Sequence, residues 1–289
     1  MIPSSELIIN PDGSVFHLHL LPEQLADNVI LVGDPGRVEL ITSLFDSTEY
    51  TVKNREFVTT TGKYKGTRIT VCATGIGTDN IDIVINELDA LANIDLKTRE
   101  VKAQKRRLNF VRIGTSGGLQ SYLDVNSFVI SRKAIGFDGL LNFYANRDSV
   151  CELPFEEHLK KHLDWGKQLC SPYVVEASTE LFNQIHDEDF TAGVTISAPG
   201  FYGPQGRVLR LPLANPNIND KIESFTYEGE RITNYEMECS AIYGLSKLLG
   251  HHATTVCLII ANRRNKNVNG EYHSQMKRLI IKVLDAYAD

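Results

Sequence analysis

The sequence lacks an apolar run long enough to cross a membrane, and its first residues do not have the pattern expected of a secretory signal. A bilayer-spanning helix needs ~20 consecutive apolar residues, and no stretch of the chain approaches that length. The first residues, MIPSSELIINPDGSVFHLHL, do not place a basic segment before an apolar one, as a secretory signal does. Both absences predict a cytoplasmic protein without a membrane partner.

Cysteine is scarce, and its pattern excludes two classes of site. The chain has five cysteines, an odd number at wide spacings with no CxxC pair: Cys72, Cys151, Cys170, Cys239 and Cys257. This pattern fits neither a disulfide framework nor a structural zinc site and predicts reduced thiols. His17 and His19 alternate with apolar residues in VFHLHL, but no third ligand is evident, so no firm metal site is predicted.

Positive charge is in the minority. Lysine and arginine number 30 against 36 acidic residues, for a formal net charge of −6. This balance argues against a general nucleic-acid binder but does not exclude a small anionic substrate. One segment, 97–107 (KTREVKAQKRR), holds six basic residues and one acid. It has no interleaved aromatics, so we expect a solvated loop or helix face, although its role stays open.

Strand and helix patterns alternate along the 289 residues, and no linker or repeat interrupts them. Helical spacing of apolar residues marks 79–94 and 273–288. Residues 55–75 form a predicted hairpin, and the apolar or β-rich runs are 28–33, 109–114, 124–135, 190–200, 232–238 and 254–263. The alternation predicts one α/β domain over 1–289, with a mixed, mostly parallel central sheet flanked by helices.

Two predicted strands each end beside a glycine and an arginine. VGDPGR (32–37) delivers Gly33 and Arg37 to the start of a helix, and VRIGTSGG (111–118) carries Arg112 and Thr115. An arginine in a buried strand is costly unless an anion pairs with it. The two segments predict one anion site at the carboxyl edge of the sheet. A plain strand-to-helix turn is the alternative, whereas the GxGxxG and P-loop spacings are absent.

Two further segments carry groups suited to binding a sugar and a flat polar ring. In NYEMEC (234–239), Glu236 and Glu238 point the same way on an extended chain, as a sugar diol requires. In FYGPQGR (201–207), Gln205 and Arg207 follow Phe201, which can stack on a ring. The alternatives are an exposed acidic edge or a pair of glycosidase acids for the first segment, and a polar surface turn for the second.

The motifs, taken in order, resemble the nucleoside phosphorylase family that includes uridine phosphorylase. The resemblance runs from VFHLHL through VGDPGRVE, NREF, ATGIG, RIGTSG, FYGPQGR and NYEME to IIANR, about residues 14–264. It implies a partly closed barrel-like sheet. It also implies the reversible phosphorolysis of uridine to uracil and ribose 1-phosphate in pyrimidine salvage.

The resemblance assigns roles to matching positions. Gly33, Arg37, Arg112 and Thr115 resemble the phosphate site, with Arg55 donated by a neighbouring subunit. Glu236, Met237 and Glu238 resemble the ribose site, with His17 from the neighbour. Phe201, Gln205 and Arg207 resemble the base site, lined by Ile260 and Ala261 and steadied by Arg263. The residues implied to act in catalysis are Arg207, Gln205, Glu238 and Arg112.

The resemblance also implies what the protein works with. Inorganic phosphate is the co-substrate, no organic cofactor is implied, and a homodimer is the minimal unit, with the family's hexamer as the larger state. Glu56, Ile76 and Asn80 match positions that bind a monovalent cation between subunits in some relatives, where a serine replaces Asn80. The segments near 93–108 and 145–170 are longer than in compact relatives, which predicts surface insertions.

Two other functions stay open. The first is a purine nucleoside phosphorylase or nucleosidase on the same fold. Arg263 of NRR (262–264) opposes it, because purine enzymes carry an aspartate there and a guanidinium cannot protonate a purine. The second is a nucleoside-binding protein without turnover. FYGPQGR also swaps the Pro-Gly order that is usual in close relatives.

Overall fold

A twelve-stranded mixed sheet organises the computed structural model, which describes residues 1–288. The long strands are β1 (Asn28–Val32), β2 (Ser47–Asn54), β3 (Phe57–Tyr64), β4 (Thr67–Ala73), β7 (Asn109–Gly118), β8 (Phe128–Gly136), β10 (Phe190–Ser197), β12 (Glu230–Glu236) and β13 (His252–Asn262). The shorter strands are β9 (Tyr173–Glu176), β11 (Thr226–Tyr227) and β14 (Asn267–Val268), and β5 (Ile94–Asp95) and β6 (Glu100–Val101) pair separately.

The strand order closes part of the sheet into a ring. The order is β11-β12-β10-β8-β13-β7-β1-β4-β3-β2, and β12 also pairs with β7. Strands β4, β1, β7 and β13 run parallel, as do β8, β10 and β12, while β13–β8 and β12–β7 are antiparallel. The single α/β domain and its partly closed sheet are therefore confirmed.

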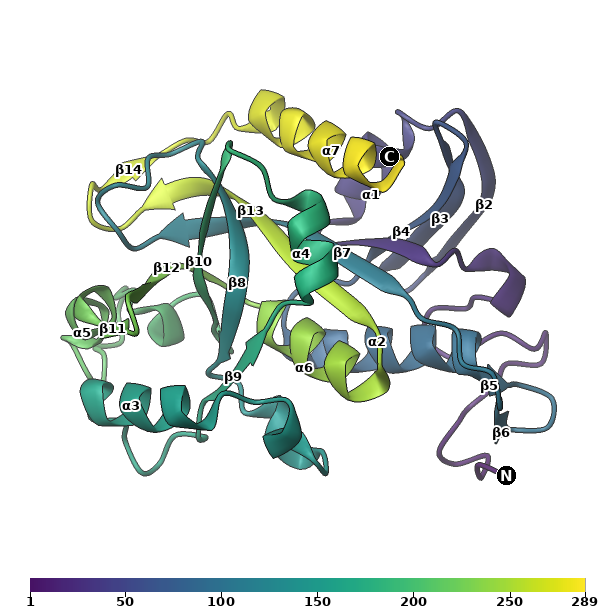
Figure 1. The fold of residues 1–289 in the computed structure, drawn as a ribbon, viewed down its shortest axis with the longest axis horizontal. Helices are drawn as coiled ribbons and strands as arrows, with labels where there is room; N and C mark the ends of the chain where they lie inside the picture. The colour runs from purple at the N-terminus through teal and green to yellow at the C-terminus, as the bar shows by residue number, and fades with distance from the viewer. Residues whose placement is uncertain (289) are drawn as a thin grey trace.

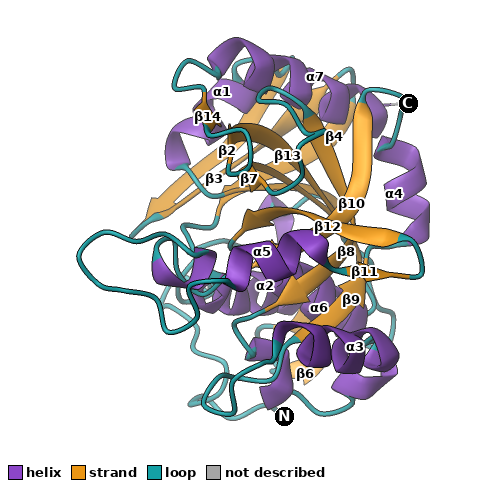
Figure 2. Cartoon of the chain, turned by 90° about the vertical axis from the view of Figure 1, so that its left-hand side faces the viewer, coloured by secondary structure: helices purple, strands orange, loops and turns teal. Residues whose placement is uncertain are grey.

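Helices cover the sheet on both sides (Figure 1). The helices are α1 (Pro35–Thr42), α2 (Thr78–Asn93), α3 (Leu153–Leu163), α4 (Thr179–Ile185), α5 (Ile218–Ser224), α6 (Cys239–Leu249) and α7 (His273–Ala288). Helices α1 and α7 lie on one side of the sheet, and α2 and α6 pack together on the other (Figure 1). Figure 2 shows α3 and α5 beside each other at the edge near β11 and β12.

The main core lies between these layers. Val29, Ile30 and Leu31 of β1 are fully buried, as near-continuous apolar runs in a covered parallel sheet should be. On α2, Ile81, Val84, Ile85, Leu88 and Leu91 are buried, which confirms the face predicted from their spacing. No helix within residues 1–288 is both long and apolar enough to span a bilayer.

One predicted boundary is wrong. The run predicted to end at residue 114 continues as strand, because β7 pairs through Gly118 with β13 and β12. Helix α3 ends at Leu163, and Asp164 after it takes a left-handed conformation with φ of 47°. The exposed strand β2 had no prediction, because most of its residues are polar and its pairing with β3 leaves no local pattern in the sequence.

The two predicted insertions hold different structures. Residues 93–108 form the β5–β6 hairpin and the loop after it, and 145–170 include α3 and a 3-10 turn, η3 (Arg147–Ser149). In the basic loop, Arg99 donates to the Leu7 carbonyl, Arg106 to Asp27, and Arg107 to the Gly250 carbonyl. These basic residues fasten the loop to the chain. That both segments are insertions stays a prediction.

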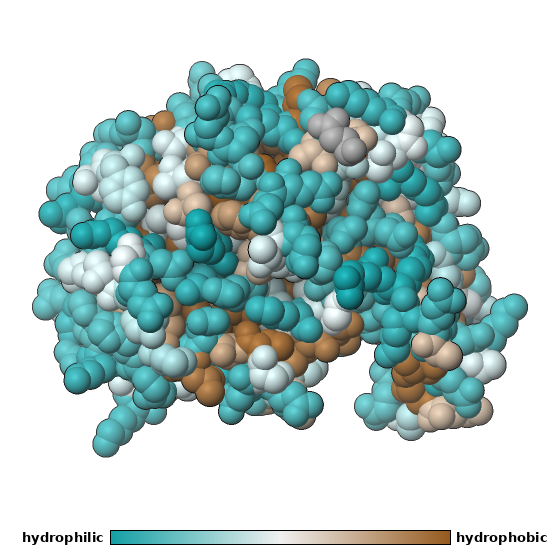
Figure 3. Space-filling model, viewed as in Figure 1, coloured by the Kyte–Doolittle hydropathy of each residue, from teal (hydrophilic) through white to brown (hydrophobic). Residues whose placement is uncertain are grey.

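The face seen in Figure 3 is mainly hydrophilic, with a band of apolar side chains below its centre, over α6. The other 3-10 turns are η1 (Pro22–Gln24), η2 (Leu140–Phe143) and η4 (Gly203–Gln205). The turn η4 falls inside the FYGPQGR segment.

Candidate active site

The two predicted anion-binding arginines lie side by side at the end of β1. Arg112 extends from the middle of β7 and is 5% exposed, and Arg37 from the first turn of α1 is 8% exposed. Arg37 Nη1 donates to the Ile113 carbonyl at 3.1 Å, which ties α1 to the strand that carries Arg112. Burial lowers the pKa of Arg37, and the nearby positive charge of Arg112 lowers it further.

Arg112 is held by both predicted ribose carboxylates. Its Nη2 donates to Glu238 Oε2, and its Nη1 lies 3.3 Å from Glu236 Oε2. All three side chains are almost fully buried. Burial alone would lower the pKa of Arg112, but Glu238 and Glu236 raise it above its usual value. The two carboxylates therefore form a buried cluster around one cation and not an exposed acidic edge.

The two carboxylates have different neighbours. Glu236, the last residue of β12, accepts from Ser197 Oγ and from the backbone N–H groups of Glu238 and Cys239, and so caps the start of α6. Burial raises the pKa of Glu236 to about 7 against the opposing effect of Arg112. Glu238 has fewer partners within residues 1–288. Its Oε1 accepts from the Gly77 N–H at 2.8 Å, and its Oε2 accepts from Arg112. Glu238 is therefore the carboxylate with more freedom to bind a substrate hydroxyl.

The ATGIG segment brings several predicted residues together. A Cβ on Gly33 would lie 3.4 Å from the Gly75 carbonyl oxygen, so the ends of β1 and β4 nearly touch. Gly75 has a φ of +72°, and a side chain there would overlap the Asn80 amide and approach Glu56. Asn80 and Glu56 thus flank Gly75, beside the exposed Ile76. The cation role of these positions stays a prediction.

A second cluster forms around the Gln205 side chain, which is 3% exposed. Gln205 Oε1 accepts from Arg207 Nη1 at 2.7 Å and from Arg263 Nη2 at 3.1 Å. Arg263 Nη1 also donates to the Gln205 carbonyl at 2.6 Å. Since Arg207 and Arg263 both donate to Oε1, they fix the orientation of the amide.

Phe201 and Arg207 lie together at the outer side of this cluster. The Arg207 guanidinium carbon is 3.6 Å from the centre of the half-exposed Phe201 ring, and Nη1 donates to the Phe201 carbonyl. Burial lowers the pKa of Arg207, as does the positive charge of Arg263. The structure thus brings Phe201, Gln205, Arg207 and Arg263 into one group, as the motif suggested.

Tyr235 and Asn219, which no motif singled out, connect this group to the sheet. The Tyr235 hydroxyl donates to Asn219 Oδ1 at 3.1 Å, and Asn219 Nδ2 donates to the Gln205 carbonyl at 3.4 Å. The Arg263 guanidinium carbon lies 5.5 Å from the centre of the Tyr235 ring. Tyr235 immediately precedes Glu236, so the base cluster and the carboxylate cluster share strand β12.

His17 and Arg55 lie together at a different place on the surface. Arg55 is exposed in the β2–β3 turn, and its guanidinium carbon is 5.5 Å from the centre of the Phe16 ring. Asn54 Nδ2 donates to the His17 carbonyl at 2.7 Å, and His17 Nδ1 lies 2.6 Å from Glu87 Oε1. His19 instead faces Asp12 at 3.2 Å, so the two histidines do not converge.

The remaining predicted residues lie along the strand ends. Thr115, on β7, pairs with Leu258 of β13, and Ile260 and Ala261 lie near the end of β13. Thr115, Ile260 and Ala261 are half-buried. Met237 is half-buried between the two carboxylates in sequence. Their roles stay predictions. Sequence reasoning missed Gly77 and Ser197, because a backbone donor and a serine in a strand carry no chemical pattern of their own.

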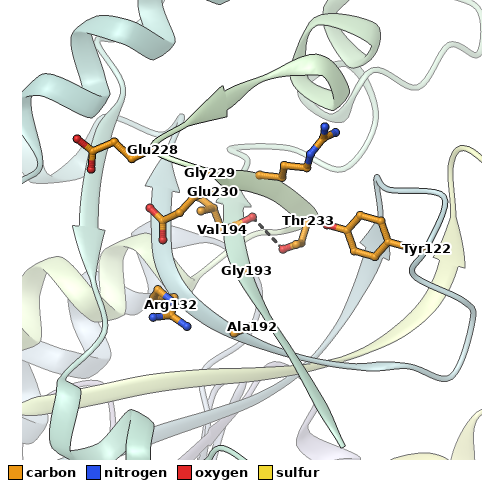
Figure 4. Close-up of a pocket in the computed structure, with 10 residues that line it drawn as sticks. Tyr122, Arg132, Ala192, Gly193, Val194, Glu228, Gly229, Glu230 and Thr233 are labelled. Atoms are coloured by element: carbon orange, nitrogen blue, oxygen red, sulfur yellow. Dashed lines mark hydrogen bonds between the residues drawn. The ribbon is translucent and has the colours of Figure 1, made fainter. Parts of the chain in front are cut away.

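Two cavities lie apart from these residues. One, of about 380 Å³, opens on β8, β10 and β12 and is lined by Arg132, Glu230 and Thr233 among others (Figure 4). The second, of about 780 Å³, lies behind the FYGPQGR segment and includes Gly203 and Pro204 in its wall. No side chain assigned above to phosphate, ribose or base lines either cavity.

Comparison with known proteins identifies the family. The model of the Phosphorylase superfamily matches residues 27–287, nearly the whole chain. The protein belongs to this superfamily. The match begins before β1 and ends within α7, so it includes both the carboxylate cluster and the base cluster.

Individual members of the superfamily match over most of their length. The uridine phosphorylase of Thermococcus kodakarensis is 30% identical over 266 residues, which cover 90% of this chain and 82% of the relative. A crystal structure of a Trypanosoma brucei nucleoside phosphorylase, described as showing uridine phosphorylase activity, superposes with a TM-score of 0.85 at 30% identity, covering 97% of this chain and 98% of that one.

The superfamily includes members named for other bases. The guanosine phosphorylase of Halorubrum lacusprofundi is 25% identical over 256 residues, covering 87% of this chain and 86% of the relative. The chain is therefore a nucleoside phosphorylase, a pentosyltransferase that takes a nucleoside and phosphate.

Proposed function

We propose that the protein is a uridine phosphorylase, which converts uridine and phosphate reversibly into uracil and ribose 1-phosphate. The observation that carries the proposal is the Gln205 amide, oriented by Arg207 and Arg263 beside the Phe201 ring. Since Oε1 already accepts from both arginines, the amide offers its Nε2 donors, and these together with the Arg207 donors match the carbonyl oxygens of uracil. Relatives named uridine phosphorylases at 28–30% identity support the same assignment.

The charge of the cluster favours a pyrimidine leaving group. As the bond from the sugar to the base nitrogen breaks, its electron pair leaves with the base, and Arg207 and Gln205 stabilise the resulting anion. A purine departs best after protonation at N7, which needs an acid. The side chains that hydrogen-bond the Gln205 amide oxygen are both arginines, and neither can supply a proton near neutral pH.

The buried cluster would handle the sugar and the phosphate. A phosphate oxygen forms the new bond to the anomeric carbon as the base leaves, and Arg37 and Arg112 hold the remaining oxygens. Glu238 accepts hydrogen bonds from the ribose hydroxyls, while Glu236 stays bound to the start of α6. Phosphate alone completes this chemistry, with no organic cofactor.

The proposal includes a dimer as the smallest active unit. Arg55 and His17 share one surface corner, and Arg55 is exposed. A guanidinium at such a corner can reach a phosphate bound by a neighbouring copy. In an isologous pair, each copy then supplies Arg55 and His17 to the other's site.

A nucleoside panel tests the proposal. We expect phosphate-dependent release of uracil from uridine, followed by ultraviolet absorbance, and little release of base from inosine or guanosine. Deoxyuridine and thymidine belong in the panel, because the carboxylates do not by themselves exclude a 2′-deoxy sugar. The variant Gln205→Met keeps the side-chain length and removes the amide, so uridine turnover should fall about 10²-fold.

Three results would contradict the assignment. Inosine cleavage with inert uridine would make the protein a purine enzyme. Base release at an equal rate without phosphate would make it a nucleosidase. Saturable uridine binding with no turnover of any nucleoside in the panel would leave only a binding protein.

A further inference from the structure

The larger cavity, of about 780 Å³, has the size and lining of a small-molecule site. Most of its wall is apolar and includes the aromatic rings of Phe137 and Trp165 and three prolines, Pro199, Pro204 and Pro212. The wall joins the segment after α3 to the back of the FYGPQGR segment at Gly203 and Pro204. No residue placed in the phosphorylase site lines it, so it is a separate space.

One half-buried carboxylate, Asp138, is among the side chains that line this cavity. Its Oδ1 accepts from the Leu140 N–H at 2.8 Å and from the Tyr173 hydroxyl at 2.9 Å, and its Oδ2 accepts from Ser240 Oγ at 3.0 Å. All these donors are neutral, and no cationic side chain within residues 1–288 forms an ion pair with Asp138. A half-buried carboxylate that is held only by neutral donors has a charge that a cationic ligand could balance.

The other acid in the wall does not share this property. Asp164 lies at the exposed rim and forms an ion pair with Lys221 at 2.5 Å. Burial raises the pKa of Asp138, against the lowering effect of its hydrogen bonds, which means that its charged form lacks full compensation. A positive charge in the cavity would provide that compensation.

An aromatic pair lies beside this carboxylate. The Trp165 and Phe137 ring centres are 4.6 Å apart, and both rings line the cavity. Trp165 Nε1 donates to the Cys170 carbonyl at 2.9 Å, which orients the indole. Aromatic faces next to an anion favour a ligand that joins a flat apolar body to a cationic head.

We propose that this cavity binds a small organic cation, a primary ammonium on an aromatic or apolar body, with the ammonium at Asp138 and the body between Trp165 and the proline-rich wall. The proposal is independent of the base that the phosphorylase site accepts. It predicts that a cationic ligand binds more tightly than an anionic ligand of similar shape, because the Asp138 carboxylate attracts the first and repels the second.

Binding can be followed by the protein's own fluorescence. Trp165 is the only tryptophan of the chain. Fluorescence excited at a wavelength that tryptophan absorbs and tyrosine does not therefore reports on this cavity. The probes are phenethylamine, 2-phenylethanol and phenylacetate, which share one body and carry a cationic, neutral and anionic head. We expect phenethylamine to bind about tenfold more tightly than 2-phenylethanol, as a charge-assisted hydrogen bond predicts. Phenylacetate should bind most weakly.

Two variants locate the site. In Asp138→Asn, the preference of phenethylamine over 2-phenylethanol should fall to within about twofold, because the charge-assisted bond is lost. Circular dichroism checks that this variant folds. Cys170 is exposed, whereas Cys151 is half-buried and the other three cysteines are buried. Alkylation of Cys170 with N-ethylmaleimide should abolish binding in a protein that keeps Asp138. Cys170→Ser, treated with the same reagent, is the matched control and should still bind.

Specific results would overturn the proposal. Equal affinity for the three probes, or no saturable change in Trp165 fluorescence with phenethylamine, would show that the cavity does not select a cationic ligand. An amine preference that survives in folded Asp138→Asn would place the charge recognition elsewhere. Full binding after alkylation of Cys170 would place the probe outside this cavity. Uridine turnover is not a readout in any of these measurements, so a different base specificity leaves the result unaffected.

Discussion

Arg112 and Arg207 are both arginines of the candidate site, but the structure holds them in different ways. Arg112 projects from a ten-residue strand, is 5% exposed and is paired with two buried carboxylates. Arg207 follows a short 3-10 turn, is half-buried, and rests on the Phe201 ring without an acidic partner. Under the proposed function, the chemistry that all nucleosides share would depend on the core, whereas recognition of the base would depend on the FYGPQGR segment.

The largest effect should follow from Arg112→Ala. This change leaves Glu236 and Glu238 buried without their cation, so the free energy of unfolding should fall by about 3–5 kcal/mol. Phosphorolysis should also fall by about 10³-fold or more, because a phosphate ligand is lost. Denaturant unfolding and ultraviolet assays measure the two quantities separately.

The triple variant Arg112→Met with Glu236→Gln and Glu238→Gln is the control. It removes all three charges, so it should recover much of the stability and none of the activity. If Arg112→Ala alone unfolds at the wild-type midpoint, the cluster does not support the fold and the contrast between the two regions is lost.

Arg207→Ala should separate activity from stability. We expect turnover of uridine to fall about 10²-fold, because one preorganised donor to the leaving base is lost. The free energy of unfolding should change by less than about 1 kcal/mol, because the side chain is half-exposed and has no buried partner charge. Arg210→Ala, at an exposed position of the same segment, is the matched control and should change neither quantity. A large loss of stability in Arg207→Ala would show that the base segment belongs to the core.

The same contrast explains how far the sequence could be interpreted. Gly33, Arg37 and Arg112 were predictable as one site, because the carboxyl ends of parallel strands meet at one edge of a sheet. The partners of Arg112 were not predictable. An arginine in a buried strand requires an anion, but the sequence does not show whether that anion is a phosphate or the carboxylates of Glu236 and Glu238. The hydrogen bond from the Tyr235 hydroxyl to Asn219 joins residues from two different elements, and no local sequence pattern predicts it.

Variants at Arg55, which lies beside His17 on the surface, test whether one chain supplies every residue of its own active site. Arg55→Ala and Arg207→Ala should each reduce turnover strongly when made alone. If Arg55 acts in the neighbouring copy, a hybrid dimer of the two variants contains one fully intact site and should show about half of the wild-type activity. Co-expression with two different affinity tags isolates the hybrid. A hybrid that is as inactive as its parents would mean that Arg55 acts within its own chain, and an Arg55→Ala variant with full turnover would mean that Arg55 has no role.

The smallest effect should come from Tyr235→Phe, which removes only the hydroxyl that links the base segment to strand β12. The Tyr235 hydroxyl donates to Asn219, which in turn donates to the Gln205 carbonyl. Loss of one such hydrogen bond costs about 1 kcal/mol, so KM for uridine should rise about fivefold as Gln205 loses its fixed position. KM for phosphate should stay unchanged, because Arg37 and Arg112 lie in the other region.

Asn219→Ala should reproduce this change, and the double variant with Tyr235→Phe should add little to it, because both act through one contact. Steady-state kinetics with each substrate varied in turn measures the effect. If KM for phosphate rises as much as KM for uridine, the hydroxyl supports β12 as a whole, and the two regions cannot be altered independently at this strand.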